Sequence, residues 1–194
     1  MARVLEFDYD KAIHKATRIF WKKGYSGTSL RDLLQGMGIG EGSFYNTLKS
    51  KKQLYLECLK HYNDTVGRRR FSALFSPASA KEGVRAFFKS VLDDLDDPKT
   101  ARACLMARSV SSDVLADADL KKVVRGNMTA FVGAFAERLK FAKDKGELPM
   151  DFESEVVAQI IGTYVQGLFR SVLVSYDRSE LERQVDRFLT SVGL

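Results

Sequence analysis

The sequence predicts an all-α protein with a small N-terminal head and a larger helical body, about nine helices in all. Apolar residues recur three or four positions apart over almost the whole chain, as in helices with one buried face. Only 3 of the 194 residues are proline, and 45% are hydrophobic, which suffices for a buried core. An excess of basic residues near the N-terminus distinguishes the head from the body.

Three short helices joined by glycine-marked turns are expected in the first 50 residues. Asp8 is a good N-cap for the first helix, and Gly24 is placed to end it. The second helix is expected to begin at Thr28 and to end at Gly38, and the third covers about residues 41–48. This order of helix, turn and short helix is that of a helix-turn-helix.

The next helices are expected to form a connector and the first part of the body. The S-x-x-Q pattern that begins at Ser50 is a capping box, which opens a fourth helix over about residues 51–72. A break at 76–79 precedes a fifth helix, marked by apolar residues over 84–95, and a sixth covers about 101–115. We take residues 1–50 as the head and 51–194 as the body, with helix 51–72 as connector.

The three C-terminal helices are expected to include a surface for self-association. A long seventh helix stops at Gly146, an eighth covers about 151–176, and a ninth contains the apolar residues from Leu181 to Val192. Adjacent apolar pairs along the eighth exceed what one packing face needs, which favours a dimer, although an ordinary core helix is the alternative. The expected interface residues are Ile161, Val165, Leu168, Val185, Phe188 and Leu189.

The charge of the chain is divided unevenly along its length. The first 72 residues carry 14 basic and 7 acidic side chains, whereas the remaining residues carry 17 and 18. All of the net charge of +6 therefore comes from the first third. This distribution fits a polyanion-binding head, although a solvated basic face would give the same count.

Several classes of protein are disfavoured by what the sequence lacks. The N-terminus has no apolar leader segment, and no run of about 18 apolar residues occurs, so we expect a cytoplasmic protein without a membrane span. Cys58 and Cys104 are too few for a disulfide framework, and His14 and His61 form no metal-ligand pattern. No nucleophile motif is present. We expect no enzymatic activity, no cofactor and no metal.

The stretch from residue 24 to 54 contains the parts of a DNA-binding surface. Helix N-termini at Thr28 and Lys51 would attract phosphates, and Gly42 would let the third helix approach DNA closely. Tyr45 should point outward because Phe44 occupies the inward position. The expected DNA-contacting residues are Thr28, Ser29, Gly42, Ser43, Tyr45, Asn46, Lys49 and Lys51.

This stretch resembles the DNA-binding domain of the TetR (tetracycline repressor) family of bacterial regulators. The resemblance covers about a quarter of the chain in three patterns, which are Phe20-x-x-x-Gly24-Tyr25-x-Gly27-Thr28-Ser29, Gly38-Ile39-x-x-Gly42-Ser43-Phe44-Tyr45 and Ser50-Lys51-x-x-Leu54. It implies a homodimer, by default a repressor, whose two heads bind a palindromic double-stranded DNA operator. It also implies that the body binds a small-molecule inducer, which releases the DNA.

The resemblance also assigns roles to individual residues. It implies phosphate contacts for Thr28, Tyr45 and Lys51, and contacts in the DNA groove for Gly42, Ser43 and Asn46. Some positions depart from the family pattern: Leu34 and Gly36 replace common alanines, Gly40 replaces a common hydroxyl N-cap, and Glu41 and Leu48 are unusual. These departures leave the preferred base sequence open.

The body contains candidates for an inducer site. Cys104 is expected near the start of the sixth helix, where the helix N-terminus, Arg102 and Arg108 would favour a reactive thiolate. Cys104 and Leu105 also resemble an electrophile-sensing branch of the family. A sensor that acts through protein contacts, with weakened operator recognition, is the alternative function. The expected ligand-binding residues, for which ordinary core packing is the alternative, are Phe88, Cys104, Met106, Phe131, Phe135, Tyr164 and Arg170.

Overall fold

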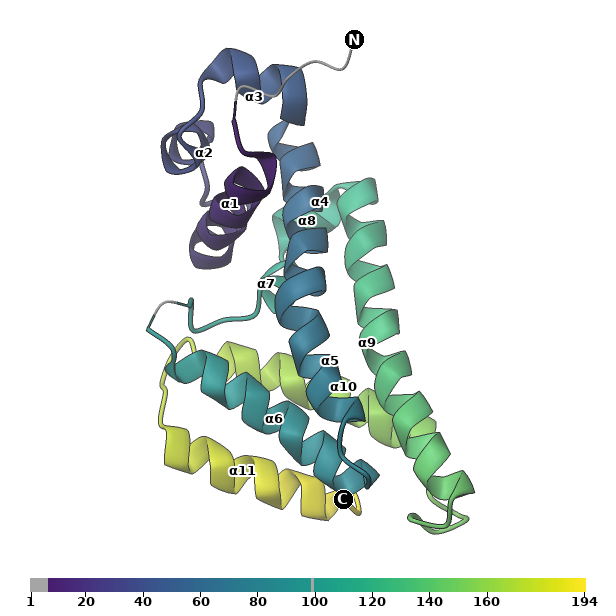
Figure 1. The fold of residues 1–194 in the computed structure, drawn as a ribbon. Coiled ribbons are helices and arrows are strands. Elements are labelled where there is room, and N and C mark those ends of the chain that lie inside the picture. Colours follow the sequence, from purple (N-terminus) through teal and green to yellow (C-terminus); the bar gives the residue numbers. More distant parts are fainter. Residues whose placement is uncertain (1–6, 99) are drawn as a thin grey trace. The chain divides into compact units, whose positions relative to one another are not determined.

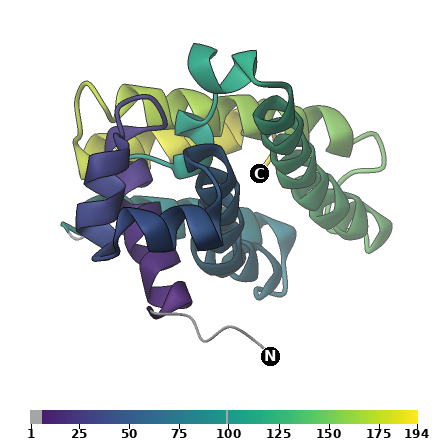
Figure 2. The same cartoon turned by 90° about the horizontal axis from the view of Figure 1, so that it is seen from above.

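The computed structural model describes residues 7–98 and 100–194, and all regular structure within these ranges is helical (Figure 1; seen from above in Figure 2). The all-α prediction is therefore confirmed. The chain forms two compact units. The N-terminal unit comprises the chain up to Val66 together with Cys104–Val124, and the C-terminal unit comprises Gly67–Ala103 and Arg125–Leu194. The domain boundary expected after residue 50 stays a prediction.

The N-terminal unit begins with α1 (Tyr9–Lys23), α2 (Leu30–Met37) and α3 (Glu41–Leu48). The side chain of Asp8 accepts a hydrogen bond from the Lys11 backbone N–H over 3.0 Å, which confirms the expected N-cap. Gly24 and Gly38 end α1 and α2 with φ of 75° each, a value that favours glycine. The second helix begins two residues later than expected, because Ser29 rather than an earlier residue caps it.

The core of the N-terminal unit lies between α1, α2, α3 and α4 (Lys51–Tyr62). The Phe20 and Tyr55 rings pack edge to face with centroids 4.8 Å apart, and Trp21 packs in the same way on Tyr62. The largest fully buried side chains of this core are Phe20, Leu33, Phe44, Leu48, Leu54, Tyr55, Leu59 and Tyr62.

The fourth helix is not continuous to residue 72 as the sequence suggested. It is regular over α4 and passes into a π-helical segment, η1 (Asn63–Gly67), before α5 (Arg68–Phe75) continues the path. The side chain of Ser50 accepts from the Gln53 backbone N–H over 3.0 Å, so the expected cap is present. The unit boundary falls at the end of the π-helical segment.

The prediction of a single sixth helix over about residues 101–115 is wrong. This part of the chain contains two short helices, α7 (Leu105–Arg108) and α8 (Ser112–Ala116). The buried Ser109 separates them: its hydroxyl donates to the Leu105 carbonyl over 2.8 Å and shares a 2.7 Å hydrogen bond with the Tyr55 hydroxyl. A contact with α4 therefore overrides the local helical pattern.

The C-terminal unit contains α5, α6 (Ala80–Asp96), most of α9 (Ala118–Asp144), α10 (Ser154–Ser171) and α11 (Arg178–Ser191). Its aromatic cluster consists of Phe71, Phe87, Phe131 and Phe135, whose ring centroids lie 4.9 to 6.2 Å apart.

One buried ion pair joins α5 to α6 in this unit. Arg70 is 5% exposed and Asp94 is 6% exposed, and Arg70 Nε donates to the Asp94 carboxylate over 2.9 Å. A side chain at Gly83 would meet the backbone carbonyl of Leu74, so the two helices approach through their backbones.

The predicted dimer residues are mostly inside the C-terminal unit. Ile161, Val165 and Leu168 on α10 are buried, as are Val185 and Leu189 on α11, and only Phe188 is partly exposed. These buried side chains pack in the core of this unit, and their assignment to an interface stays a prediction. Within the described residues, no helix is both long and apolar enough to cross a membrane.

Candidate nucleic-acid interface

The third helix presents one buried face and one exposed face, as expected. It spans Glu41–Leu48, the predicted range. Phe44 is fully buried, whereas Tyr45, Asn46 and Gly42 are exposed, and the ring of Tyr45 packs on Phe44 at a centroid distance of 5.3 Å. No atom lies within 4 Å of a side chain built at Gly42, so this end of the helix is open to a partner. Ser43 is half-buried.

The N-terminus of α2 is already capped by the chain itself. The Ser29 side chain accepts from the Asp32 backbone N–H over 3.1 Å, and Asp32 accepts in return from the Ser29 N–H over 2.9 Å. A hydrogen bond from Lys23 holds the pKa of the Asp32 carboxyl well below its usual range. Thr28 is fully buried, and its hydroxyl donates to the Gly24 carbonyl over 2.7 Å. The Thr28 side chain is thus bonded within the chain, and a phosphate contact at this helix N-terminus stays a prediction.

The connection from α3 to α4 is a tight turn at Lys49. The Ser50 backbone N–H donates to the Leu48 carbonyl over 2.7 Å, and Lys49 between them has φ of 62° and ψ of −48°. This is the strained form of the γ-turn. The Lys49 ammonium donates to the Asn46 carbonyl over 2.7 Å, so the exposed lysine lies at the end of α3.

Lys51 opens α4 and is held by an aromatic side chain that the sequence did not identify. Its ammonium lies 4.5 Å from the ring centroid of Tyr25, within the range of a cation–π contact. Tyr25 in turn packs on Tyr55 with ring centroids 4.8 Å apart. Burial lowers the pKa of the Lys51 ammonium, and the carboxylate of Asp113 opposes this change.

An acidic segment over residues 113–119 is bonded to the α1–α2 loop and to the start of α4. These contacts were not predicted from the sequence. The backbone N–H and the hydroxyl of Ser26 both donate to the Asp113 carboxylate, the former over 3.2 Å. Lys52 pairs with Asp117 at 3.0 Å and with Asp119 at 2.5 Å. The acidic residues follow Ser26 by more than 80 positions in sequence, and no local pattern reveals such a contact.

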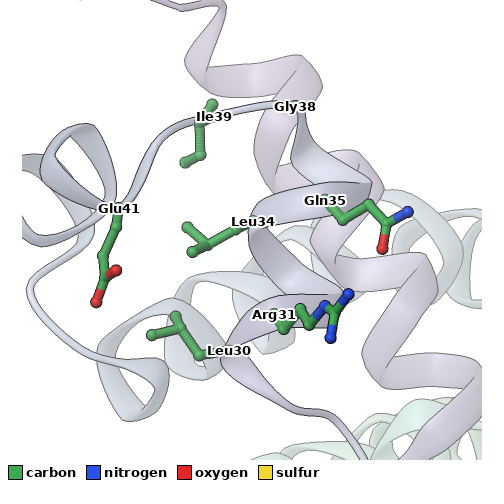
Figure 3. A pocket seen from close by; sticks show the side chains of 7 residues that line it. All are labelled: Leu30, Arg31, Leu34, Gln35, Gly38, Ile39 and Glu41. Atoms are coloured by element: carbon green, nitrogen blue, oxygen red, sulfur yellow. The ribbon is translucent and has the colours of Figure 1, made fainter.

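A pocket of about 670 Å³ lies along α2 and the turn that follows it. Figure 3 shows Leu30 and Leu34 on α2 and Ile39 in the turn, on the side of α2 that faces Glu41 of α3. The unusual residues Leu34 and Glu41 both line it. Gly36 instead serves the contact with α1, because a side chain at this position would meet Ile19.

The candidate ligand-binding residues are divided between the two units. Cys104 and Met106 belong to the N-terminal unit, and the others belong to the C-terminal unit. Phe88 and Phe135 are buried in aromatic contacts, Phe131 and Tyr164 are half-buried, and Arg170 is exposed in the last turn of α10. These seven residues therefore do not form one continuous site within either unit.

The two cysteines have different surroundings in the N-terminal unit. Cys58 is fully buried on α4, and burial raises the pKa of its thiol to about 12. Cys104 is the N-cap residue of α7 rather than part of a longer helix, and its sulfur accepts a hydrogen bond from the Tyr62 hydroxyl over 3.4 Å.

The C-terminal unit has an apolar groove of about 470 Å³ along α10 and α11. Val156 and Ile160 are 45% and 42% exposed, although both are aliphatic. Tyr164 and Phe188 line the same groove and stack face to face with ring centroids 3.8 Å apart. The exposed apolar face of α10 is thus displaced by one residue from the predicted one.

Comparisons with known proteins identify the family. A family model described as "Bacterial regulatory proteins, tetR family" matches residues 12–58. YezE of Bacillus subtilis (strain 168), an uncharacterised HTH-type transcriptional regulator, is 32% identical over 187 residues, which cover 96% of each chain. The chain belongs to the TetR family.

Other TetR-family and HTH-type regulators agree with this assignment. The repressor ComR of Escherichia coli (strain K12) is 23% identical over 163 residues, covering 84% of this chain and 78% of ComR. CifR, a TetR-family regulator solved as a cysteine mutant with 26-base-pair operator DNA, superposes with a TM-score of 0.91 at 28% identity and covers 97% of this chain and 98% of that one. The TetR-family match at 12–58 includes every expected DNA-contacting residue.

Proposed function

We propose that this TetR-family regulator is a homodimeric repressor that binds a palindromic DNA operator and is released by a small-molecule inducer. The observation that carries the DNA-binding part is the exposed face of α3, where Gly42, Tyr45 and Asn46 lie together beside Lys49 and the N-terminus of α4. The likeness to CifR, which was solved on operator DNA, supports the same proposal.

The residues of this surface divide into phosphate contacts, base contacts and a helix cap. Tyr45 and Lys51 contact phosphates, and Lys49 adds a positive charge at the end of α3. Asn46 reads base edges, because an amide both donates and accepts hydrogen bonds in the major groove. Ser29 contributes chiefly as a helix cap, since its hydroxyl and backbone N–H are bonded to Asp32.

Fluorescence anisotropy with the DNA upstream of the gene tests this function. Lys51→Ala should weaken binding to all sequences and reduce the dependence of log K on log salt by about one unit. Lys60→Ala is the matched control, because Lys60 is an exposed lysine in the last turn of the same helix. Asn46→Ala should instead change the preferred sequence. Equal salt dependence for Lys51→Ala and Lys60→Ala would contradict the proposed contact.

We propose that the dimer forms through the groove between α10 and α11. Val156 and Ile160 expose aliphatic surface there, and Tyr164 and Phe188 extend it. Contact with a second copy would remove this surface from water.

Analytical ultracentrifugation of Ile160→Asp tests the dimer. The variant should sediment as a folded monomer, because the new charge lies on the exposed face of α10. Val174→Asp is the control, since Val174 is 91% exposed and does not line the groove. A dimeric Ile160→Asp variant would place the interface elsewhere.

A cysteine-dependent response is a second candidate for the inducing signal. Cys104 joins the start of α7 to the Tyr62 hydroxyl of α4, so modification of its sulfur would disturb a contact inside the N-terminal unit. Cys104→Ser should keep operator affinity and abolish release by N-ethylmaleimide, whereas release that persists in Cys104→Ser but not in Cys58→Ser would assign the effect to Cys58.

A further inference from the structure

Residues 104–119, which we call the strap, run antiparallel to α4 within the N-terminal unit. Near one end of the strap, the Tyr62 hydroxyl donates to the sulfur of Cys104. In its middle, the hydroxyls of Tyr55 and Ser109 share a buried hydrogen bond of 2.7 Å. Residue numbers on α4 thus decrease as residue numbers on the strap increase, so the two segments are antiparallel.

The far end of the strap reaches the N-terminus of α4 and the loop before α2. Asp117 and Asp119 both pair with Lys52, the neighbour of the phosphate-contacting candidate Lys51. Asp113 accepts two hydrogen bonds from Ser26 in the α1–α2 loop. The same short acidic segment therefore holds two regions that are distant from it in sequence.

The α1–α2 loop and the N-terminus of α4 position the candidate DNA-binding residues. The α1–α2 loop leads into α2, which carries α3 through the turn at Gly38, and the N-terminus of α4 carries Lys51. Phosphates on a DNA duplex are regularly spaced, so contacts from α3 and α4 fit only when their separation is fixed.

We propose that the strap sets this separation and that Asp113 is a positioning residue for DNA binding. The inference rests on the proposed function, since it concerns the same interface. The chain enters the strap from the C-terminal unit at the junction 103–104 and returns to that unit at 124–125, five residues beyond the strap. A displacement of the strap would therefore break the Ser26 and Lys52 contacts and release the α1–α2 loop.

The sign of the expected effect separates positioning from simple electrostatics. Removal of a carboxylate makes the N-terminal unit more positive, which by itself strengthens binding to DNA. Loss of the Asp113 contact should weaken binding instead, because the α1–α2 loop loses its anchor. Asp10→Asn is the matched control: it removes a carboxylate from the first turn of α1 in the same unit.

The test measures binding of full-length variants to the upstream DNA over a range of salt concentrations. Asp113→Asn removes the charge of the acceptor and Ser26→Ala removes the hydroxyl donor, so each should weaken binding by about tenfold. In the double variant the two losses should not add, because both act on the same contact. Ser26→Thr, which keeps the hydroxyl, should bind like the wild type. The salt dependence should stay unchanged, since no phosphate contact is lost.

Hydrogen exchange without DNA provides an independent measurement. Asp113→Asn should speed amide exchange at Ser26 and in the first turn of α2, while exchange within α3 stays slow in the folded variant. Tighter binding by Asp113→Asn, as for Asp10→Asn, or unchanged exchange in the loop would overturn the inference. Failure of the wild type to bind the DNA would overturn the proposed function, whereas the exchange result would still decide whether the strap holds the loop.

Discussion

The contacts inside the N-terminal unit differ in kind from those inside the C-terminal unit. In the N-terminal unit, the strap is bonded to the α1–α2 loop and to α4 through partly exposed carboxylates, such as the Asp113 that accepts from Ser26. In the C-terminal unit, an aromatic cluster forms part of the core, and the ion pair of Arg70 and Asp94 is almost completely buried.

This difference determines which contacts weaken when the salt concentration rises. Exposed ion pairs each contribute little to stability and weaken as salt rises, whereas a buried pair is costly to break. The exposed contacts of Asp113, Asp117 and Asp119 can therefore break at small cost, whereas the buried pair resists rearrangement of α5 against α6. Trp21, the only tryptophan in the sequence, lies in the N-terminal unit and reports on it by fluorescence.

The largest expected effect comes from breaking the buried pair. Asp94→Ala should destabilise the protein by about 3–5 kcal/mol, because it leaves the Arg70 charge buried without its carboxylate. Asp93→Ala is the control, since Asp93 is partly exposed and its loss should cost about 1 kcal/mol or less. Urea unfolding followed by circular dichroism measures both. A cost below about 1 kcal/mol for Asp94→Ala would remove the contrast between the units.

An intermediate effect is expected at the strained turn between α3 and α4. Lys49→Gly should stabilise the N-terminal unit by up to about 1 kcal/mol, since glycine accepts positive φ and relief of strain exceeds its entropic cost. Lys49→Ala should give no such gain, because it loses the charge and keeps the strain. Trp21 fluorescence during urea unfolding measures the change. Equal stability of the two variants would show that the turn stores no strain.

The smallest effect is a pH dependence confined to the N-terminal unit, which contains both histidines. Burial, followed by the charge of His14, lowers the pKa of His61 from 6.5. The unfolded chain then takes up the proton first as pH falls below 6.5, so stability declines through the window down to the lowered pKa. His61→Gln should flatten this decline in Trp21 fluorescence melts. An unchanged dependence of stability on pH in His61→Gln would assign the decline to another titratable group.

The local sequence pattern predicted the elements that depend on local chemistry. Asp8 caps α1, the glycines at 24 and 38 end the first two helices, and α3 has its predicted range. The inward Phe44 and outward Tyr45 also follow from helical periodicity alone. In each case the signal lies within a few residues of the feature that it predicts.

Features that depend on distant contacts could not be predicted in this way. No glycine or proline marks the division between α7 and α8. The buried Ser109 at this point is bonded to the Tyr55 hydroxyl, which is 54 residues away in sequence. On α10 the face with Ile161 is the predicted exposed face, whereas packing against the rest of the unit buries Ile161 and leaves Ile160 exposed. The burial of Thr28 and the bond from its hydroxyl to the Gly24 carbonyl are likewise not visible in a residue pattern.

The position of the strap in the chain affects how the protein is made. The N-terminal unit is discontinuous: Gly67–Ala103, which belongs to the other unit, separates α4 from the strap. A ribosome adds roughly 5–20 residues per second, so α1 to α4 emerge some seconds before the segment that anchors their loop. A nascent chain that ends at Val66 therefore lacks the acidic segment, and completion of the DNA-binding surface waits for synthesis to pass residue 119.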